Sequence, residues 1–128
     1  MTKFIIDSYA WIEYMDGTAK GRIVKELIEN FKNEKYTCVL SISELVSKFV
    51  RKGMDPLSVF SAIKSLSTVV NIDDNTCFLA GKMHAGVRKT IHDFGLVDAF
   101  LVVLAKDMNA KIVTGDPHFK GMKNVIFI

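Results

Sequence analysis

The chain has 128 residues, of which 49% are hydrophobic and 24% charged, and its formal net charge is +3. This balance excludes an intrinsically disordered chain, and the length predicts a single domain over residues 1–128. No apolar run approaches the ~18 residues of a membrane span, and no secretory signal precedes the first strand-like run, so we expect a cytoplasmic protein. Cys38 and Cys77 are too few for a disulfide framework, and we expect both to be buried, reduced thiols.

Short apolar runs alternate with helical patterns along the whole chain. The runs are continuous, as in strands buried on both faces, and cover residues 4–6, 36–40, 69–72, 111–113 and 125–128. Apolar spacing and capping residues predict helices over residues 8–15, 20–34, 41–52, 56–65, 74–92 and 96–108. This order predicts a three-layer α/β/α sandwich with a central, mainly parallel five-stranded sheet.

Acidic residues occur close to the ends of several predicted strands. Asp7 directly follows the first strand, Glu44 comes soon after the second, and Asp116 follows the fourth. Asp98 lies in the first turn of the last predicted helix. Because ligands of open α/β sheets bind at the carboxyl ends of the strands, the four acids can meet at one edge. Gathering them there leaves seventeen basic against ten acidic groups elsewhere, a balance of +7 that suits nucleic acid.

Each of these acids also has a structural explanation. Asp7 could be the N-cap of the helix that follows it, and Asp116, between a glycine and a proline, could shape a turn. Ser41 and Glu44 have the spacing of a capping box, and the pattern alone favours capping or solvation for Glu44. Asp98 is harder to explain in this way, because it lies on an apolar stripe of its helix, where a charge needs a partner or a metal.

Carboxylates that meet in one cleft repel one another. Two charges ~4 Å apart cost about 4 kcal/mol at an effective dielectric constant near 20, and a hard cation removes that cost. The predicted cluster offers oxygen ligands alone, with no Cys or His, and such a set selects Mg²⁺ or Mn²⁺ over zinc. These ions activate water and stabilise the charge that develops on a phosphodiester, which is nuclease chemistry.

Four segments of the sequence resemble the motifs of PIN domains, in the family's order and over the whole chain. They are Phe-Ile-Ile-Asp-Ser ending at Ser8, Ser-x-x-Glu-Leu ending at Leu45, Leu-Val-Asp-Ala-Phe-Leu ending at Leu101, and Ile-Val-Thr-Gly-Asp-x-x-Phe ending at Phe119. The length is similar to that of the VapC toxins of toxin–antitoxin pairs.

This resemblance implies a Mg²⁺- or Mn²⁺-dependent endoribonuclease that cuts single-stranded RNA. It also implies a homodimer and an antitoxin protein that reaches into the acidic cleft. The catalytic and metal-binding positions of the family fall on Asp7, Glu44, Asp98 and Asp116, with supporting hydroxyls at Ser8 and Thr114. The resemblance therefore overrides the capping interpretation of Glu44, although one residue can serve both purposes.

The sequence departs from the family pattern just after Asp116. Many relatives carry a further acid there, whereas this chain has Pro117 and His118, so the number of metal ions stays open. We interpret His118 as a solvent-exposed residue, with a contact to phosphate as the alternative. Asp93 is interpreted as a residue at a helix end, outside the cluster.

Basic and aromatic residues near these motifs are candidates for RNA contacts. Lys48 and Arg51 lie one and two turns beyond Glu44, where they could bind RNA phosphates or simply be solvated. Trp11 follows Asp7 closely, and we expect it in the core or in a dimer interface.

Other functions fit parts of the pattern. A receiver-like signalling domain also clusters carboxylates around Mg²⁺, but it needs an acidic pair after its first strand, where this chain has the single Asp7. A small-molecule binder has little support, because no Gly-rich phosphate loop follows any predicted strand. A PIN fold that binds RNA or protein without cutting, and a stand-alone RNA-processing nuclease, are the alternatives to a toxin.

Overall fold

A parallel sheet forms the centre of the protein in the computed structural model, which describes residues 2–128. Within that range five strands are arranged in the order β3-β2-β1-β4-β5, and each neighbouring pair is parallel. The strands are β1 (Lys3–Ile6), β2 (Glu34–Cys38), β3 (Thr68–Val70), β4 (Lys111–Thr114) and β5 (Val125–Phe127). The prediction of a five-stranded, mainly parallel sheet is therefore confirmed.

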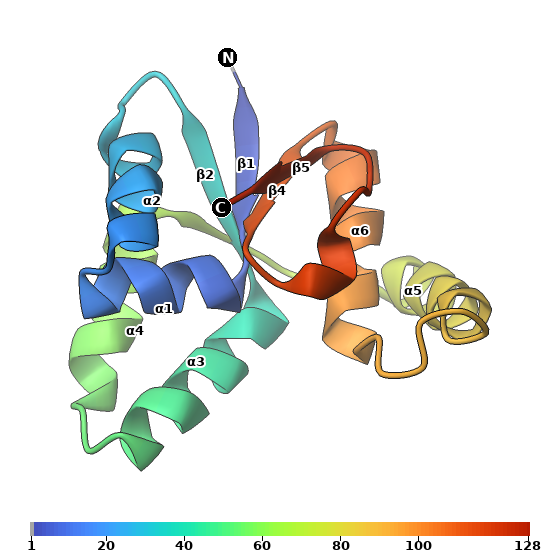
Figure 1. The fold of residues 1–128 in the computed structure, drawn as a ribbon, viewed down its shortest axis with the longest axis horizontal. Helices are drawn as coiled ribbons and strands as arrows, with labels where there is room; N and C mark the ends of the chain where they lie inside the picture. The colour runs from blue at the N-terminus through green and yellow to red at the C-terminus, as the bar shows by residue number, and fades with distance from the viewer. Residues whose placement is uncertain (1) are drawn as a thin grey trace.

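Helices cover both faces of this sheet (Figure 1). They are α1 (Ser8–Asp16), α2 (Ala19–Glu29), α3 (Val39–Arg51), α4 (Pro56–Leu66), α5 (Asp74–Val87) and α6 (Leu96–Met108), with a 3-10 turn, η1 (Pro117–Phe119), after β4. Side chains from α1, α2, α3 and α4 build the core on one face of the sheet, and α6 builds the core on the other. The three-layer α/β/α architecture is as predicted.

The central strand β1 shows why the apolar runs are continuous. Phe4 and Ile6 pack with Trp11 in one core, whereas Ile5 packs with Leu101 in the other. Successive side chains of a strand point to opposite faces, so a strand covered on both sides needs apolar residues at every position. Trp11 is fully buried and donates its indole N–H to Thr37 Oγ1 at 3.1 Å, which places it in the core.

Two helices end earlier than predicted. The second helix was expected to reach residue 34, but α2 ends at Glu29, and Phe31 beyond it is 84% exposed. Asn30 takes an extended conformation there, and the Asn33 side chain donates to the carbonyl of Leu27 at 3.0 Å, which satisfies part of the helix end. Similarly, α5 ends at Val87 rather than near residue 92.

Two smaller expectations concern the thiols and the membrane. Cys38 is buried as expected, but Cys77 is exposed, and both are free thiols. Among the residues that the structure describes, no helix is both long enough and apolar enough to cross a membrane.

The strand order reverses between β1 and β4. From β1 the chain builds the sheet outward through β2 and β3, and later builds the other side through β4 and β5. Ligands of open α/β sheets bind at such a reversal, outside the carboxyl ends of the strands. Asp7 leaves β1 at this point and Asp116 follows β4, so the fold brings two of the predicted acids to the favoured position.

Candidate active site

An acidic cleft of about 420 Å³ opens at the carboxyl ends of β1 and β4. It is lined by Asp7, Ser8, Tyr9, Ile12, Glu44, Lys48, Arg51, Asp93, Gly95, Asp98, Asp116 and His118. All four acids predicted from the sequence therefore face one cavity. A larger hollow of about 580 Å³ lies between α5 and α6, but it is lined largely by side chains such as Leu79, Met83 and Val102 and contains none of these four acids.

Asp7 is held by the neighbouring strand β4 and by the first residue of α1. Its backbone N–H donates to Val113 O at 3.1 Å, and its carboxylate accepts the N–H of Ser8 and the hydroxyl of Thr114, each at 2.7 Å. The carboxylate thus caps α1 and faces the cleft at once, so the two interpretations of Asp7 are compatible. Burial raises the pKa of Asp7 to about 6, and the charges of Asp98 and Asp116 add to this, against the opposing effect of the Thr114 hydroxyl.

Asp116 is fixed by the turn that it starts. Its carboxylate accepts the N–H of His118 at 2.9 Å, and its own N–H donates to Thr114 Oγ1 at 3.0 Å. Pro117 occupies the first position of η1, where a proline costs no hydrogen bond. The expected turn therefore exists, and it aims the Asp116 carboxylate into the cleft.

Gly115 is required by close packing rather than by its backbone angles. A Cβ at this position would collide with the ring of Tyr9. Tyr9 thus presses directly against the backbone between Thr114 and Asp116, and this contact fixes one wall of the cleft.

The capping box that the spacing of Ser41 and Glu44 suggested as an alternative does not form. Helix α3 begins at Val39, directly after β2, so Ser41 already lies inside the first turn. Ser41 is fully buried, and among the described residues its hydroxyl has no hydrogen-bond partner. Glu44 instead lines the cleft, where burial of its carboxyl group, followed by the charge of Asp7, raises its pKa even though much of the residue is exposed.

Asp98 reaches the cleft from the first turn of α6. Its carboxylate accepts the N–H of Gly95 at 3.3 Å, and its side chain is 17% exposed. Burial raises the pKa of Asp98 to about 6, and the charges of Asp116 and Glu44 add to this. Without a cation, the cleft therefore contains carboxylates whose charges are poorly compensated.

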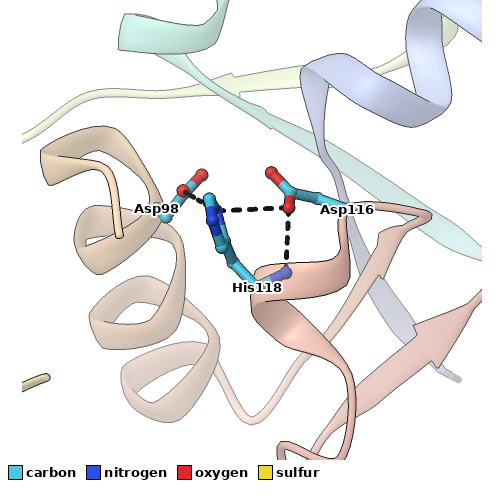
Figure 2. Close-up of side chains that lie close together, drawn as sticks. All are labelled: Asp98, Asp116 and His118. Atoms are coloured by element: carbon cyan, nitrogen blue, oxygen red, sulfur yellow. Dashed lines mark hydrogen bonds and ion pairs between the residues drawn. The ribbon is translucent and has the colours of Figure 1, made fainter. Parts of the chain in front are cut away.

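His118 and Asp93 belong to the cleft, contrary to the interpretation from the sequence. The His118 side chain is 25% exposed, and its ring stands between the carboxylates of Asp98 and Asp116 (Figure 2). Its Nε2 lies 3.0 Å from Asp93 Oδ1, and its Nδ1 lies 3.3 Å from Asp116 Oδ1. The ring packs against buried Phe94, with 6.2 Å between the ring centroids.

A tighter group within the cleft has the donor spacing of a metal site. Asp98, Asp116 and His118 each offer one ligand atom, and these atoms lie within 4.8 Å of one another. The expectation of an oxygen-only cluster without histidine is therefore wrong. His118 Nδ1 is buried and makes no hydrogen bond to any described residue, so an orphaned nitrogen faces two carboxylates. This donor set fits a divalent cation.

The rim of the cleft carries the predicted basic residues. Lys48 and Arg51 extend from α3 on the same side as Glu44, and both are exposed. Tyr9 also lines the cleft, and its hydroxyl accepts a hydrogen bond from the Lys20 ammonium at 3.2 Å.

Comparison with known proteins identifies the class to which this fold and site belong. A family model of the PIN domain matches residues 4–125, so the chain belongs to the PIN-domain family. A search of curated proteins found no match.

The fold is shared with solved structures of toxin–antitoxin proteins. One is Mycobacterium tuberculosis VapC20, a sarcin-ricin loop cleaving toxin, with a TM-score of 0.78 and 15% identity, covering 95% of this chain and 96% of that one. A toxin–antitoxin complex from Klebsiella pneumoniae has a TM-score of 0.75 and 15% identity, covering 95% and 94%. VapBC2 from Rickettsia felis, bound to a DNA fragment from its promoter, has a TM-score of 0.72 and 18% identity, covering 99% and 98%.

Proposed function

We propose that residues 1–128 form one nuclease domain, a divalent-metal-dependent endoribonuclease that hydrolyses phosphodiester bonds of single-stranded RNA. The observation that carries this proposal is the convergence of Asp7, Glu44, Asp98 and Asp116 on one cleft at the reversal of strand order. Membership of the PIN family supports the reaction class, and the similar VapC20 structure, that of a sarcin-ricin loop cleaving toxin, supports RNA as the substrate.

In this proposal the four acids hold Mg²⁺ or Mn²⁺, and the surrounding groups keep them in position. The cation, when bound, supplies activation of water and stabilisation of charge on the phosphodiester. Thr114 and the Ser8 N–H orient Asp7, and the Gly95 N–H orients Asp98. Asp7 and Asp98 are therefore placed in advance, as the hydrogen bonds behind metal ligands generally ensure.

The RNA contacts are proposed on the rim of the cleft. Lys48 and Arg51 lie on the same helix as Glu44, where their charges can bind phosphates on either side of the scissile bond. Tyr9 offers an aromatic ring inside the cleft on which an unpaired base can stack, which favours single-stranded RNA.

Cleavage of a mixed-sequence single-stranded RNA tests this proposal. Purified wild type is assayed with Mn²⁺, Mg²⁺ or EDTA beside Asp98→Asn and a matched control, Asp107→Asn, which changes an exposed acid on the same helix. We expect no cleavage in EDTA, at least about a 100-fold loss in Asp98→Asn, and an unchanged rate in Asp107→Asn. If folded, metal-loaded wild type fails to cut, a non-catalytic PIN-fold module that binds RNA or protein becomes the better account.

We also propose that the protein is the toxin of a toxin–antitoxin pair and that it forms a homodimer. The similar structures from Klebsiella pneumoniae and Rickettsia felis, a toxin–antitoxin complex and VapBC2, support an antitoxin partner. Around the α3–α4 turn, this chain exposes apolar side chains that a second chain could cover, namely Val50, Met54, Leu57 and Phe60. We refer to these four residues as the α3–α4 apolar surface.

Two measurements address this part of the proposal. Sedimentation at tens of micromolar should show a dimer that Leu57→Glu in the α3–α4 apolar surface weakens and the equally exposed control Phe78→Glu on α5 does not. Only monomer in the wild type would count against the dimer. Expression of the wild type in a host cell should stop growth, and Asp98→Asn should not. Normal growth with active enzyme would favour a stand-alone RNA-processing nuclease.

A further inference from the structure

We infer that His118 is a nitrogen ligand, through Nδ1, of the cation that this cleft binds, and that this ligand makes the site prefer Mn²⁺ over Mg²⁺. The inference rests on the proposed metal function of the cleft and adds to it the ligand that distinguishes this chain from an all-carboxylate site.

The position of the imidazole supports direct coordination. His118 Nδ1 lies 3.3 Å from Asp116 Oδ1 and 3.9 Å from Asp98 Oδ2, and it is buried without a hydrogen bond to either. A nitrogen this close to two carboxylates, but not hydrogen-bonded to them, is directed at the space that all three share (Figure 2). One cation in that space would give every member of the group a partner.

Asp93 holds the opposite nitrogen of the same ring. Its Oδ1 lies 3.0 Å from His118 Nε2, so in the neutral imidazole the carboxylate favours a proton on Nε2, and the Nδ1 lone pair then faces the cleft. A carboxylate behind the ring is the usual support of a metal-bound histidine, because it fixes the tautomer and increases the basicity of the ligand. Asp93 is thus a positioning residue that acts through His118.

Packing keeps the ring in this orientation. His118 lies in the middle of η1, between Pro117 and the fully buried Phe119, which anchors the turn in the core. The ring also packs against Phe94 in a T-shaped arrangement, with 6.2 Å between the ring centroids. The imidazole is therefore presented to the two carboxylates by the fold rather than by a mobile side chain.

The presence of nitrogen changes which cation the site prefers. Mg²⁺ takes oxygen ligands in a strict octahedron, whereas imidazole suits first-row transition-metal dications. A site with two carboxylates and one imidazole therefore prefers Mn²⁺ to Mg²⁺ more strongly than the same site with three carboxylates does. Replacing His118 by aspartate creates that comparison in the same fold.

Pulsed electron paramagnetic resonance of Mn²⁺ tests the ligand without relying on activity. Metal-free wild type loaded with Mn²⁺ should show coupling of the electron spin to a directly bound ¹⁴N. Coupling should vanish in His118→Asp, which still binds Mn²⁺, and should persist in His92→Gln, which removes an exposed histidine outside the cleft. Wild type that binds Mn²⁺ without nitrogen coupling, or with coupling unchanged in His118→Asp, overturns the inference, as does wild type that binds no Mn²⁺.

Affinities provide the second readout. We expect the ratio of Mn²⁺ to Mg²⁺ affinity to fall about 10-fold in His118→Asp, and the Mn²⁺ affinity to fall about 10-fold in Asp93→Asn while nitrogen coupling remains. An unchanged ratio in His118→Asp overturns the claimed preference. RNA cleavage is scored separately: cleavage without nitrogen coupling refutes the ligand assignment alone, and nitrogen coupling without cleavage supports the ligand and refutes the nuclease.

Discussion

The hydroxyl of Thr114 donates a 2.7 Å hydrogen bond to the carboxylate of Asp7, which lies 107 positions earlier in the sequence. The two residues lie at the carboxyl ends of the neighbouring strands β1 and β4. The same hydroxyl accepts the N–H of Asp116 at 3.0 Å. One fully buried side chain thus sets the positions of two acids of the cleft.

Removing this hydroxyl should damage both the fold and the site. Thr114→Val keeps the shape of the side chain but leaves the buried Asp7 carboxylate with one donor fewer. We expect the free energy of unfolding to fall by about 1–3 kcal/mol, as for other broken buried hydrogen bonds, and RNA cleavage to fall at least about 10-fold. Thr114→Ser keeps the hydroxyl and should retain most of the activity. Urea denaturation and cleavage assays measure both effects, and a folded Thr114→Val that cuts at the wild-type rate would rule out this positioning role.

The metal-free protein should lose stability as pH rises. Burial raises the pKa of Asp7 and of Asp98 from 3.8 to about 6, so the folded state binds protons that the unfolded chain has already released. The stabilisation from these protons is complete below about pH 4 and is lost as pH rises through about 6. Urea denaturation in EDTA between about pH 4.5 and about pH 7.5 should show this fall, and Asp98→Asn should reduce it. Stability that rises over this pH range would contradict the raised pKa values of Asp7 and Asp98. Added Mn²⁺ should restore stability at the upper end of the pH range.

The contact between Gly115 and Tyr9 predicts a coupled pair of substitutions. Gly115→Ala places a Cβ against the Tyr9 ring and should lower the free energy of unfolding by about 1–3 kcal/mol, a typical cost of overpacking. The φ angle of Gly115 is not positive, so the collision rather than the backbone causes the loss. In a Tyr9→Ala background the same change should cost less, and a double-mutant cycle by urea denaturation measures the difference. Equal costs in both backgrounds would show that the two residues do not interact.

The basic rim predicts a salt-dependent contribution to RNA binding. Replacing Lys48 and Arg51 by glutamine should weaken RNA binding and reduce the slope of log affinity against log salt by about 0.7 for each phosphate of the single strand that the variant no longer neutralises. Mn²⁺ binding should not change. Arg22→Gln with Lys25→Gln on α2 is the matched control, because both residues are exposed and outside the cleft. Equal effects of the two double variants would mean that RNA does not use this rim specifically.

Much of the fold could be predicted because it depends on patterns that the sequence displays directly. The residues of β1 are apolar at successive positions because Ile5 and Ile6 face different cores. Asp7 and Asp116 could be assigned to the same edge because each directly follows a strand of a parallel sheet, whose carboxyl ends lie together. These inferences need only strand direction and order of elements.

Helix ends were less predictable, because local signals compete with packing. Ser41 and Glu44 have the spacing of a capping box, yet α3 already begins at Val39. A helix that begins there brings its buried residues Leu45 and Phe49 to the core. Phe31 fits the apolar spacing of the preceding helix, but the chain has already turned at Asn30. In both cases the three-dimensional path of the chain decided the boundary.

The roles of His118 and Asp93 could not be predicted from spacing. Asp93 lies between α5 and α6, in a segment without periodicity, so its approach to His118 depends on the tertiary fold. His118 did leave a partial signal: an Asp followed by Pro117 predicts a tight turn, and such a turn brings the next residue back over the Asp116 carboxylate. That signal indicates proximity but not the direction of the ring.

Four acids from separate parts of the chain, Asp7, Glu44, Asp98 and Asp116, are proposed to act together in metal-dependent RNA cleavage. The most direct test is the initial rate of cleavage of single-stranded RNA in Mn²⁺ by wild type and by Asp7→Asn, Glu44→Gln, Asp98→Asn and Asp116→Asn, each shown to be folded by circular dichroism. We predict that EDTA abolishes cleavage and that every variant is at least about 100-fold slower than wild type. Cleavage that persists in EDTA, or a folded Asp116→Asn that cuts at the wild-type rate, would contradict the account.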